Sequence, residues 1–429
     1  MSFKRYPAYK DSGAEWLGEV PCHWNLKRLK HNVHLLTEKT DRQDRPVALE
    51  NIESWTGRFI QTETEFMGEG IAFNEGDILF GKLRPYLAKA YRAEFSGEAV
   101  GDFHVMQPAT GIDSRFVQYQ ILNREFIDIV DGSTFGSKMP RASWEFVGSM
   151  MVTTPPLPEQ AQIAAFLDRE TAKIDGLVAE QRRLMTLLKE KRQTVISHAV
   201  TRGLDPDVPM KPSGIEWLGD VPAHWDCGGL TKFIGPIVDY RGRTPIKQES
   251  GIFLVTARNI KNGKIDYDAS EEYVDAESAE SLLQRGRPEI GDLLFTMEAP
   301  LGQAALIDRT DIALAQRIVK FRGKPNVMRS SFLLLWLMSE YCQAKLLTLA
   351  TGSTALGIKS SKLGMIDCLV PPASEQAEIV VFVACESVKF DTLTAEAQRA
   401  IDLLQERRTA LISAAVTGQI DVRDTAGSL

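Results

Sequence analysis

The clearest hydrophobic pattern lies in two long stretches without proline. Between residues 159 and 199 aliphatic side chains recur at alternating steps of four and three, and the pattern returns 216 residues later. This spacing is typical of a helix that packs on another along a narrow apolar seam. The expected seam residues are Ile163, Leu167, Ile174, Leu177, Leu184, Leu188 and Val195, then Ile379, Val383, Phe390, Leu393, Leu404 and Leu411.

The two helical stretches are predicted to pair. Some forty residues make a helix of roughly 60 Å, and a lone helix of this kind would leave its apolar stripe in water. Charged residues interrupt both seams at matching places, Glu170 with Glu386 and Lys191 with Arg407. Buried polar positions specify the register of paired helices. We expect an antiparallel coiled coil; in the alternative, each helix packs only on its own domain.

The chain also repeats itself. Residues 13–24 (GAEWLGEVPCHW) return as residues 214–225 (GIEWLGDVPAHW), with nine of twelve positions identical. Residues 155–160 and 196–201 return as 371–376 and 412–417, both 216 residues later. Between these shared ends the halves diverge. The pattern favours two similar sensors for two different targets, although a duplicated fold that diverged without functional meaning remains the alternative.

Short β-branched and aromatic runs fill each half, among them Ile252–Val255, Asp292–Phe295 and Arg317–Phe321. Helical stretches are expected near Asp113–Val130 and Ser330–Leu349. The predicted class is α+β, with two mixed or β-rich domains joined by two long antiparallel helices. The predicted boundaries are a first domain at 1–157, a central helix at 158–203, a second domain at 204–373, a distal helix at 374–424 and a tail at 425–429.

Composition narrows the class of protein. The 429 residues are 44% hydrophobic and 25% charged, which are ordinary values for a folded globular protein. Five widely spaced cysteines contain no CxxC pair, so we expect neither a disulfide framework nor a zinc site. The N-terminus lacks the apolar core of a signal peptide, and no apolar run approaches the length of a spanning helix. The expected location is the cytoplasm.

Motifs for catalysis are missing from the sequence. Residues 352–360 resemble a phosphate-binding loop, but Ile358 separates its second glycine from Lys359. His31 and His34 have no nearby cysteine or third histidine to complete a metal site. There is no GxSxG or HExxH sequence, and both Pro-Pro pairs lead into Glu-Gln rather than into an aminomethyltransferase motif. The sequence therefore predicts a protein that is not an enzyme.

The net charge of −7 gives no bulk signature of a nucleic-acid binder, but basic residues cluster locally. Arginine and asparagine can read base edges, lysine suits phosphates, and Gly-Ser-Thr loops offer amides and hydroxyls. For each cluster the alternative is an ordinary solvated surface. The candidate DNA-binding residues are Lys82, Arg84, Tyr86, Lys89, Ser133, Thr134, Lys138 and Arg141 in the first half, and Arg241, Arg243, Thr244, Lys247, Arg258, Asn259, Lys261, Ser353, Thr354 and Lys359 in the second.

Taken together, these sequences resemble the DNA specificity (S) subunit of a type I restriction-modification system. The resemblance rests on the SGxEWLGxVPxHW opening, given twice, and on the block from RGRTP through VTARNIKNG and GDLLFTMEAPLGQAAL to LAQRIV. The GST loops and the PPLPEQ or PPASEQ start of each long helix complete it. Together these motifs are specific and cover essentially the whole chain.

The resemblance implies two target recognition domains that read the two halves of a split, asymmetric duplex site. The paired helices would act as a ruler between the half-sites. It also implies double-stranded DNA, two adenine-methylating modification subunits and the restriction subunits as partners. The chain itself would bind no cofactor or metal, because S-adenosylmethionine, ATP and Mg²⁺ are expected on those partners. The alternative function is a regulatory or decayed scaffold without DNA specificity of its own.

Overall fold

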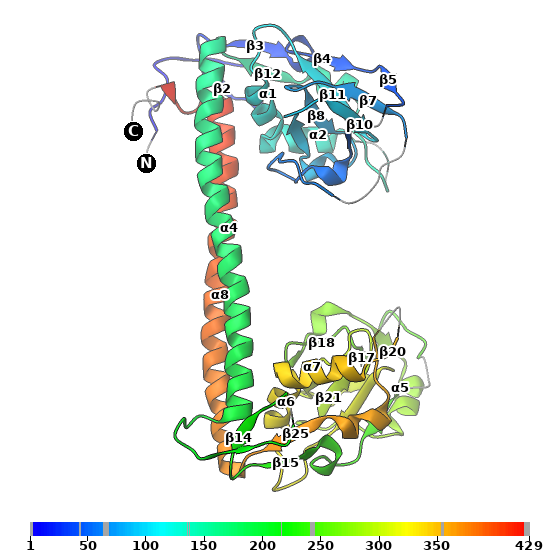
Figure 1. Cartoon of the computed structure of the whole chain (residues 1–429). Helices are drawn as coiled ribbons and strands as arrows, with labels where there is room; N and C mark the ends of the chain where they lie inside the picture. The colour runs from blue at the N-terminus through cyan, green and yellow to red at the C-terminus, as the bar shows by residue number, and fades with distance from the viewer. Residues whose placement is uncertain are drawn as a thin grey trace. The chain divides into compact units, whose positions relative to one another are not determined.

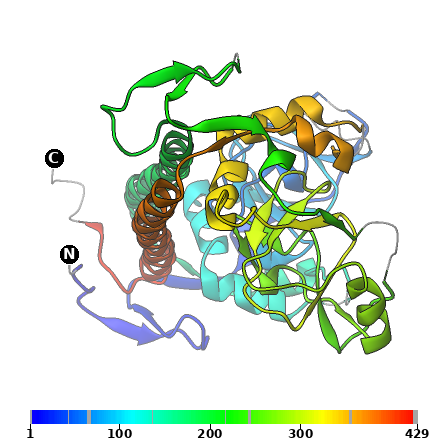
Figure 2. The ribbon, with the colours of Figure 1, turned by 90° about the horizontal axis from the view of Figure 1, so that it is seen from below.

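The computed structural model describes residues 3–42, 44–62, 68–134, 136, 138–215, 217–240, 245–352 and 356–423. It combines β-sheets with long helices (Figures 1 and 2), and the predicted α+β class is confirmed. The chain divides into two compact units, the first formed by Met1–Arg182 with Gln398–Leu429 and the second by Arg183–Ala397. No helix in the described ranges is long and apolar enough to cross a membrane.

The described residues of the first unit form four small sheets. Their orders are β1-β2, β4-β11-β8-β9, β5-β7-β10-β6 and β12-β3, with all pairings antiparallel except β6 with β10. The short helices α1 (Ser114–Ile121), α2 (Arg124–Gly132) and α3 (Trp144–Ser149) accompany the sheets. The strands are β1 (Tyr9–Asp11), β2 (Glu19–Pro21), β3 (Asn25–Arg28), β4 (Val33–Leu36), β5 (Lys39–Thr40), β6 (Pro46–Val47), β7 (Gly70–Phe73), β8 (Ile78–Gly81), β9 (Ala90–Arg92), β10 (Gly97–Val100), β11 (Phe103–Pro108) and β12 (Met151–Thr154).

The second unit repeats much of this strand order. The sheet β16-β24-β21-β22 corresponds to β4-β11-β8-β9, and β13-β14 and β15-β25 correspond to β1-β2 and β12-β3. A three-stranded sheet, β20-β17-β23, and a hairpin, β18-β19, complete it. Its elements are β13 (Met210–Pro212), β14 (Asp220–Pro222), β15 (Asp226–Gly229), β16 (Val238–Asp239), β17 (Ile252–Val255), β18 (Ile260–Lys261), β19 (Lys264–Ile265), β20 (Tyr273–Val274), β21 (Leu293–Thr296), β22 (Ala304–Leu306), β23 (Ile312–Leu314), β24 (Ile318–Phe321), β25 (Asp367–Val370), α5 (Ala276–Leu283), α6 (Ser330–Met338) and α7 (Glu340–Leu349).

Each of the two shorter stretches predicted to be helical contains two helices. The first breaks between α1 and α2, where the Asn123 side chain accepts a hydrogen bond from the Glu125 amide at 2.9 Å. The second breaks at Ser339, whose hydroxyl accepts from the Cys342 amide at 3.3 Å. Both residues act as N-caps of the following helix, and such caps favour a new helix start over a continuous helix.

The long helices are α4 (Leu157–Arg202) and α8 (Ala373–Val416). The central helix was predicted to end at residue 203, and α4 ends just before it. The distal helix was predicted to end at residue 424, but α8 ends well before that residue. Gly203 and Gly418 explain both ends, because each has a φ of +77°, the left-handed conformation in which many helices terminate. Within each unit, the part of α4 and the part of α8 that belong to it lie side by side and antiparallel (Figures 1 and 2). In the first unit, Ile163 and Leu167 share a buried cluster with Ile412 and Val416.

The buried seam of the helices differs in part from the predicted one. Ile163, Leu167, Ile174 and Leu188 are buried as expected, but Leu177 and Leu184 are 52% and 42% exposed. After Ile174, the next residue that faces the partner helix is four positions along the chain and not three, as was expected. The seam therefore contains Val178 in place of Leu177, and the half-buried Met185 in place of Leu184. The sequence is compatible with both the predicted and the observed register, because apolar residues are adjacent at these positions.

The same shift occurs in α8. Ile379, Val383 and Phe390 are buried, whereas Leu393 is 45% exposed. Val195, Leu404 and Leu411 are half-buried. The charged seam positions move likewise, from Lys191 and Arg407 to Arg192 and Arg408, which lie one residue further along.

Two equivalent ion pairs accompany the observed register. Arg192 of α4 pairs with Asp391 of α8 in the second unit, and Arg408 of α8 pairs with Asp175 of α4 in the first. Both the arginines and the aspartates stand 216 residues apart. Arg192 also donates to the Ser387 carbonyl at 2.7 Å. A one-residue slip would separate each guanidinium from its carboxylate, so these pairs favour the observed register.

A buried tryptophan joins the helix ends in each unit. In the first unit, the Trp24 indole Nε1 donates to Glu159 at the start of α4 at 3.1 Å. In the second, Trp225 donates to Glu375 at the start of α8 at 2.8 Å. The same rings pack on Gly418 and Gly203, where an added Cβ would approach Trp24 to 3.0 Å and Trp225 to 3.3 Å. The repeated Trp-containing opening thus fastens each unit to the start of one helix and the end of the other.

We predict that Glu159→Ala lowers the free energy of unfolding by about 1–3 kcal/mol, because it leaves the buried Trp24 indole N–H without its acceptor. Thermal or urea unfolding of the purified chain measures the loss. The matched control is Glu180→Ala, which removes an exposed glutamate from the same helix. Equal stability of the two variants would contradict the role given to Glu159.

Candidate nucleic-acid interface

In the first unit, two segments that are far apart in sequence form one basic surface. Residues 82–89 connect β8 to β9, and residues 138–142 precede α3. The Arg84 amide donates to the Pro140 carbonyl, and the Ala142 amide donates to the Lys82 carbonyl, both at 2.9 Å. These bonds bring Lys82, Arg84 and Arg141 onto neighbouring strands of backbone.

Asp102 organises the cations of this surface. Its two carboxylate oxygens accept from Nε and Nη2 of Arg141 at 3.1 and 2.9 Å, and Lys82 Nζ lies 3.8 Å away. The hydrogen bonds and charge of Asp102 raise the pKa of Arg141. A guanidinium held along one edge keeps Nη1 for another acceptor, and arginine forks of this kind suit guanine or phosphate.

A buried histidine supports the same surface. His104 Nε2 donates to the Ala142 carbonyl at 3.1 Å, and burial lowers the pKa of its imidazole. The ring is therefore held in its neutral form as a structural support. Of the candidates in the two segments, Arg84, Tyr86 and Lys138 are exposed.

Three other candidates of the first unit have internal roles. Lys89 Nζ donates to the Leu49 carbonyl at 2.6 Å, and burial lowers its pKa. The hydroxyls of Ser133 and Thr134 donate to the carbonyls of Val130 and Asp131 at the end of α2, at 2.7 and 2.8 Å. These side chains are committed to the fold, which weakens the prediction that they contact DNA.

The candidates of the second unit are only partly described. Arg241, Arg243, Thr244, Ser353 and Thr354 lie outside the described residues. Lys247 pairs with Glu272 at 2.8 Å. Arg258, Lys261 and Lys359 are exposed. The described cations of this unit that remain available to contact DNA therefore lie mainly around the β18-β19 hairpin.

The prediction that Asn259 reads a base is wrong. Its side chain is fully buried, and all its polar groups are used. Oδ1 accepts from the amide and the hydroxyl of Thr256, and Nδ2 donates to the carbonyls of Asp266 and Ser270, each at 2.9 Å. The amide fixes the turn and the hairpin that follow β17, so it cannot reach a base.

The first unit contains an equivalent buried asparagine, Asn51, which the sequence analysis missed. Asn51 Oδ1 accepts from the Ala48 amide at 2.9 Å, and Nδ2 donates to the Ile60 carbonyl at 3.1 Å. Its signal was present in the sequence, because VALENI at 47–52 matches VTARNI at 255–260 in its valine, alanine-containing turn, asparagine and isoleucine. An asparagine repeated in both halves favours a structural role over one in specificity.

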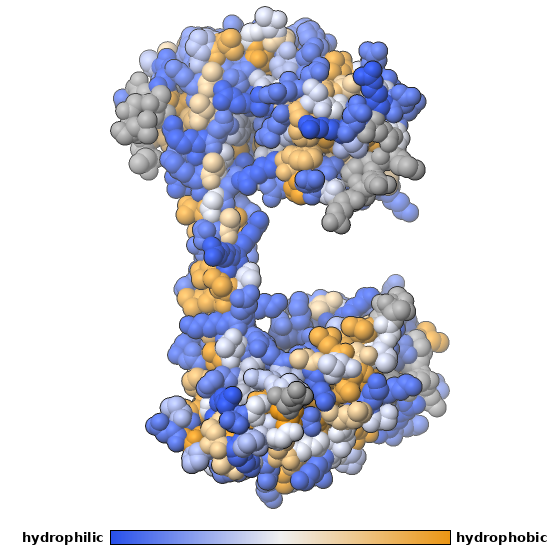
Figure 3. Space-filling model, viewed as in Figure 1, coloured by the Kyte–Doolittle hydropathy of each residue, from blue (hydrophilic) through white to orange (hydrophobic). Residues whose placement is uncertain are grey.

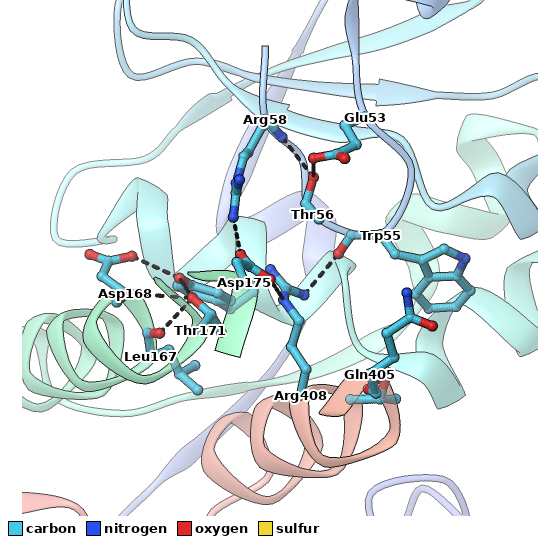
Figure 4. Close-up of polar contacts among 12 residues, drawn as sticks. Glu53, Trp55, Thr56, Arg58, Leu167, Asp168, Thr171, Asp175, Gln405 and Arg408 are labelled. Carbon is cyan, nitrogen blue, oxygen red and sulfur yellow. Dashed lines mark hydrogen bonds and ion pairs between the residues drawn. The ribbon is translucent and has the colours of Figure 1, made fainter. Parts of the chain in front are cut away.

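The hairpin that follows Asn51 contacts the parts of α4 and α8 that belong to the first unit (Figure 4). Arg58 pairs with Asp175 of α4, and Arg408 of α8 bonds the other oxygen of Asp175 at 3.2 Å. Arg408 Nη1 also donates to the Trp55 carbonyl at 2.9 Å. Asp175 and Arg408 are only 14% and 11% exposed, so water weakens this pair little. No sequence motif indicated this clamp, which we define as Trp55, Arg58, Asp175 and Arg408.

Comparison with known proteins identifies the class. Residues 233–385 match the family described as "Type I restriction modification DNA specificity domain". The MjaVIII specificity subunit of Methanocaldococcus jannaschii is 23% identical over 94% of this chain and 95% of its own length. The Escherichia coli EcoDI specificity subunit is 25% identical over 45% of this chain, and the match spans about half of that relative (46%).

A solved structure supports the fold. A chain from a study of "complex assembly and conformational transition of the type I R-M system" aligns with a TM-score of 0.67 at 16% identity, over 92% of this chain and 98% of its own. The matched residues, 233–385, are thus similar to a type I restriction-modification DNA specificity domain. The predicted resemblance of the chain to type I specificity subunits is confirmed, and with it the prediction of a non-catalytic subunit.

We predict that Asn51→Ala and Asn259→Ala each lower the free energy of unfolding by about 1–3 kcal/mol, because each leaves buried backbone groups without partners. Chemical denaturation measures both losses. Below the unfolding transition, Asn259→Ala should leave base preference unchanged. A changed base preference with unchanged stability would restore the reading role of Asn259.

Proposed function

We propose that this chain reads a split, asymmetric site in duplex DNA, with one half-site for each unit. The observation that carries this proposal is the repeated strand order with different charges on equivalent loops. The loop that holds Lys82 and Arg84 in the first unit corresponds to Met297 and Ala299 in the second; Arg84 and Ala299 share a left-handed backbone, with φ of 51° and 46°. Two units with the same strand order but different side chains on equivalent loops are suited to reading two different half-sites.

The base-reading residues proposed for the first unit are Arg84, Tyr86, Lys138 and Arg141, with Lys82 beside them. Arginine can donate to both guanine acceptors in the major groove, and lysine can neutralise a phosphate. For the second unit we retain Arg241, Arg243 and Thr244 as base-reading candidates, and Arg258, Lys261 and Lys359 as cations that contact the DNA. Because the chain carries a net charge of −7, partner subunits are expected to supply much of the phosphate contact on which affinity depends.

The second part of the proposal is that the long helices hold partner subunits. Large apolar side chains stand exposed along both helices, away from their shared seam, and Figure 3 shows apolar patches among the polar residues there. They include Leu177 and Leu187 of α4 and Val381, Val388 and Leu403 of α8, all more than half exposed. The proposed partners are two modification subunits, which would carry S-adenosylmethionine, and restriction subunits, which would carry ATP and Mg²⁺.

Methylation mapping tests the proposal directly. The chain would be produced with its cognate modification subunit in a host without DNA methylation, and the genome read by single-molecule sequencing. We expect N6-methyladenine in a split motif with two different half-sites. Methylation by the purified chain alone would contradict the non-catalytic role. Absence of a new motif from an assembled complex would favour the scaffold without DNA specificity.

The ruler can be tested by lengthening both helices together. The insertion points would be residue 184 of α4 and residue 399 of α8. Inserting one heptad after each adds about 10 Å of helix, or about three base pairs at ~3.4 Å per pair. We expect a motif with unchanged half-sites and a gap longer by about three base pairs. An unchanged gap in a folded, active complex would refute the ruler.

A further inference from the structure

The two units contain equivalent hairpins with different surroundings. The first-unit hairpin runs from Ile52 to Phe59, which form a backbone bridge, and the second-unit hairpin pairs Ile260 with Ile265. Each follows a buried asparagine, Asn51 or Asn259. Each also contains a left-handed glycine: an added Cβ would lie 2.1 Å from the Ala90 carbonyl oxygen at Gly57 and 3.0 Å from Met338 Sδ at Gly263. The two hairpins therefore occupy corresponding places.

The first hairpin is engaged within the molecule. Arg58 and the Trp55 carbonyl bind the helices through the clamp with Asp175 and Arg408 (Figure 4). Two acidic residues stand at the start of this hairpin, since the exposed Glu50 precedes the buried asparagine and the half-buried Glu53 follows it. This hairpin is therefore a poor surface for a polyanion.

The second hairpin has the opposite charge and no such clamp. Arg258 and Lys261 stand where the first unit has Glu50 and Glu53, and Lys264 stands at the position of Arg58. All three are exposed, and within the described residues none makes an ion pair or a side-chain hydrogen bond. On the helices, Arg192 and Asp391 correspond to the clamp residues Arg408 and Asp175 and bind each other in the same way, but Arg192 donates further to the Ser387 carbonyl of α8 rather than to a hairpin.

The arrangement of the two lysines is unfavourable in the free protein. Lys261 and Lys264 are directly opposite across the antiparallel hairpin, and like charges at such positions destabilise a strand pair. No acid in the described residues forms an ion pair with either lysine. A polyanion bound from outside would remove this repulsion, which distinguishes the hairpin from an ordinary solvated surface.

We propose that the β18-β19 hairpin grips the DNA phosphate backbone through Arg258, Lys261 and Lys264, whereas its first-unit counterpart has become a clamp on the long helices. This inference rests on the proposed DNA-reading function and makes it asymmetric. Exposed lysines on a short hairpin act as point charges, which suits phosphates better than base edges. The hairpin thus contributes affinity to the half-site of the second unit and leaves the choice of bases to other residues.

The test compares salt dependence of binding. The full chain, assembled with its cognate modification subunit, would be titrated with duplex DNA that contains its motif, at several salt concentrations. For Lys261→Ala with Lys264→Ala, we expect binding roughly tenfold weaker and a salt slope smaller by about 2, because each lost phosphate contact removes close to one unit. The methylated motif should stay the same. Thermal unfolding should not show destabilisation, since both side chains are exposed.

A matched control removes the same charge elsewhere. Lys27 and Lys30 are exposed in the first unit, and Lys27→Ala with Lys30→Ala should leave the slope near that of the wild type. An unchanged slope in the hairpin variant, or an equal fall in the control, would overturn the proposal. A changed motif would show that the hairpin reads bases. If the wild-type complex shows no preference for any site, the proposed function itself fails, while the slope comparison still decides whether the hairpin binds phosphates.

Discussion

Two buried tryptophans impose the constraint on which both units depend. Trp24 and Trp225 are fully buried, and each donates to a glutamate in the first turn of one long helix while packing on the glycine that ends the other. The glutamates are well placed electrostatically, because negative charge is stabilised at a helix N-terminus. This contact requires the helices to run in opposite directions, and it fixes where each domain begins relative to them.

Much of this architecture could be predicted because it is written in local sequence. The repeated openings, the Pro-Pro starts and the long stretches without proline indicate the helices directly. The seam register could not be predicted, since apolar residues are adjacent at Leu177 and Val178, and either can face the partner helix. The choice belongs to tertiary contacts such as the Arg408–Asp175 pair, which joins residues more than two hundred positions apart.

The interface was predicted less well, for a related reason. Sequence composition located the basic loops, but it could not separate side chains that face solvent from those that serve the fold. Asn259 and Lys89 have side chains that could contact DNA, but both donate hydrogen bonds to backbone carbonyls within the protein. Arg141 was identified without its organiser Asp102, which lies 39 residues away and is only apparent once the two segments are side by side. Residue type states what a group can bind, whereas burial and neighbours state whether it is available.

The division of the chain into units has a consequence for biosynthesis. The second unit is continuous in sequence, whereas the first combines residues up to 182 with residues from 398 onward. Domains commonly fold as units during translation, from the N-terminal side. Here the order is inverted: the ribosome completes the second unit first, and the buried cluster around Trp24 in the first unit must wait for the last part of α8, which supplies Ile412 and Val416 to it. Until then, the apolar side chains of α4 around Ile163 and Leu167 lack their partner, so the earliest part of the protein to be made is the last to be finished.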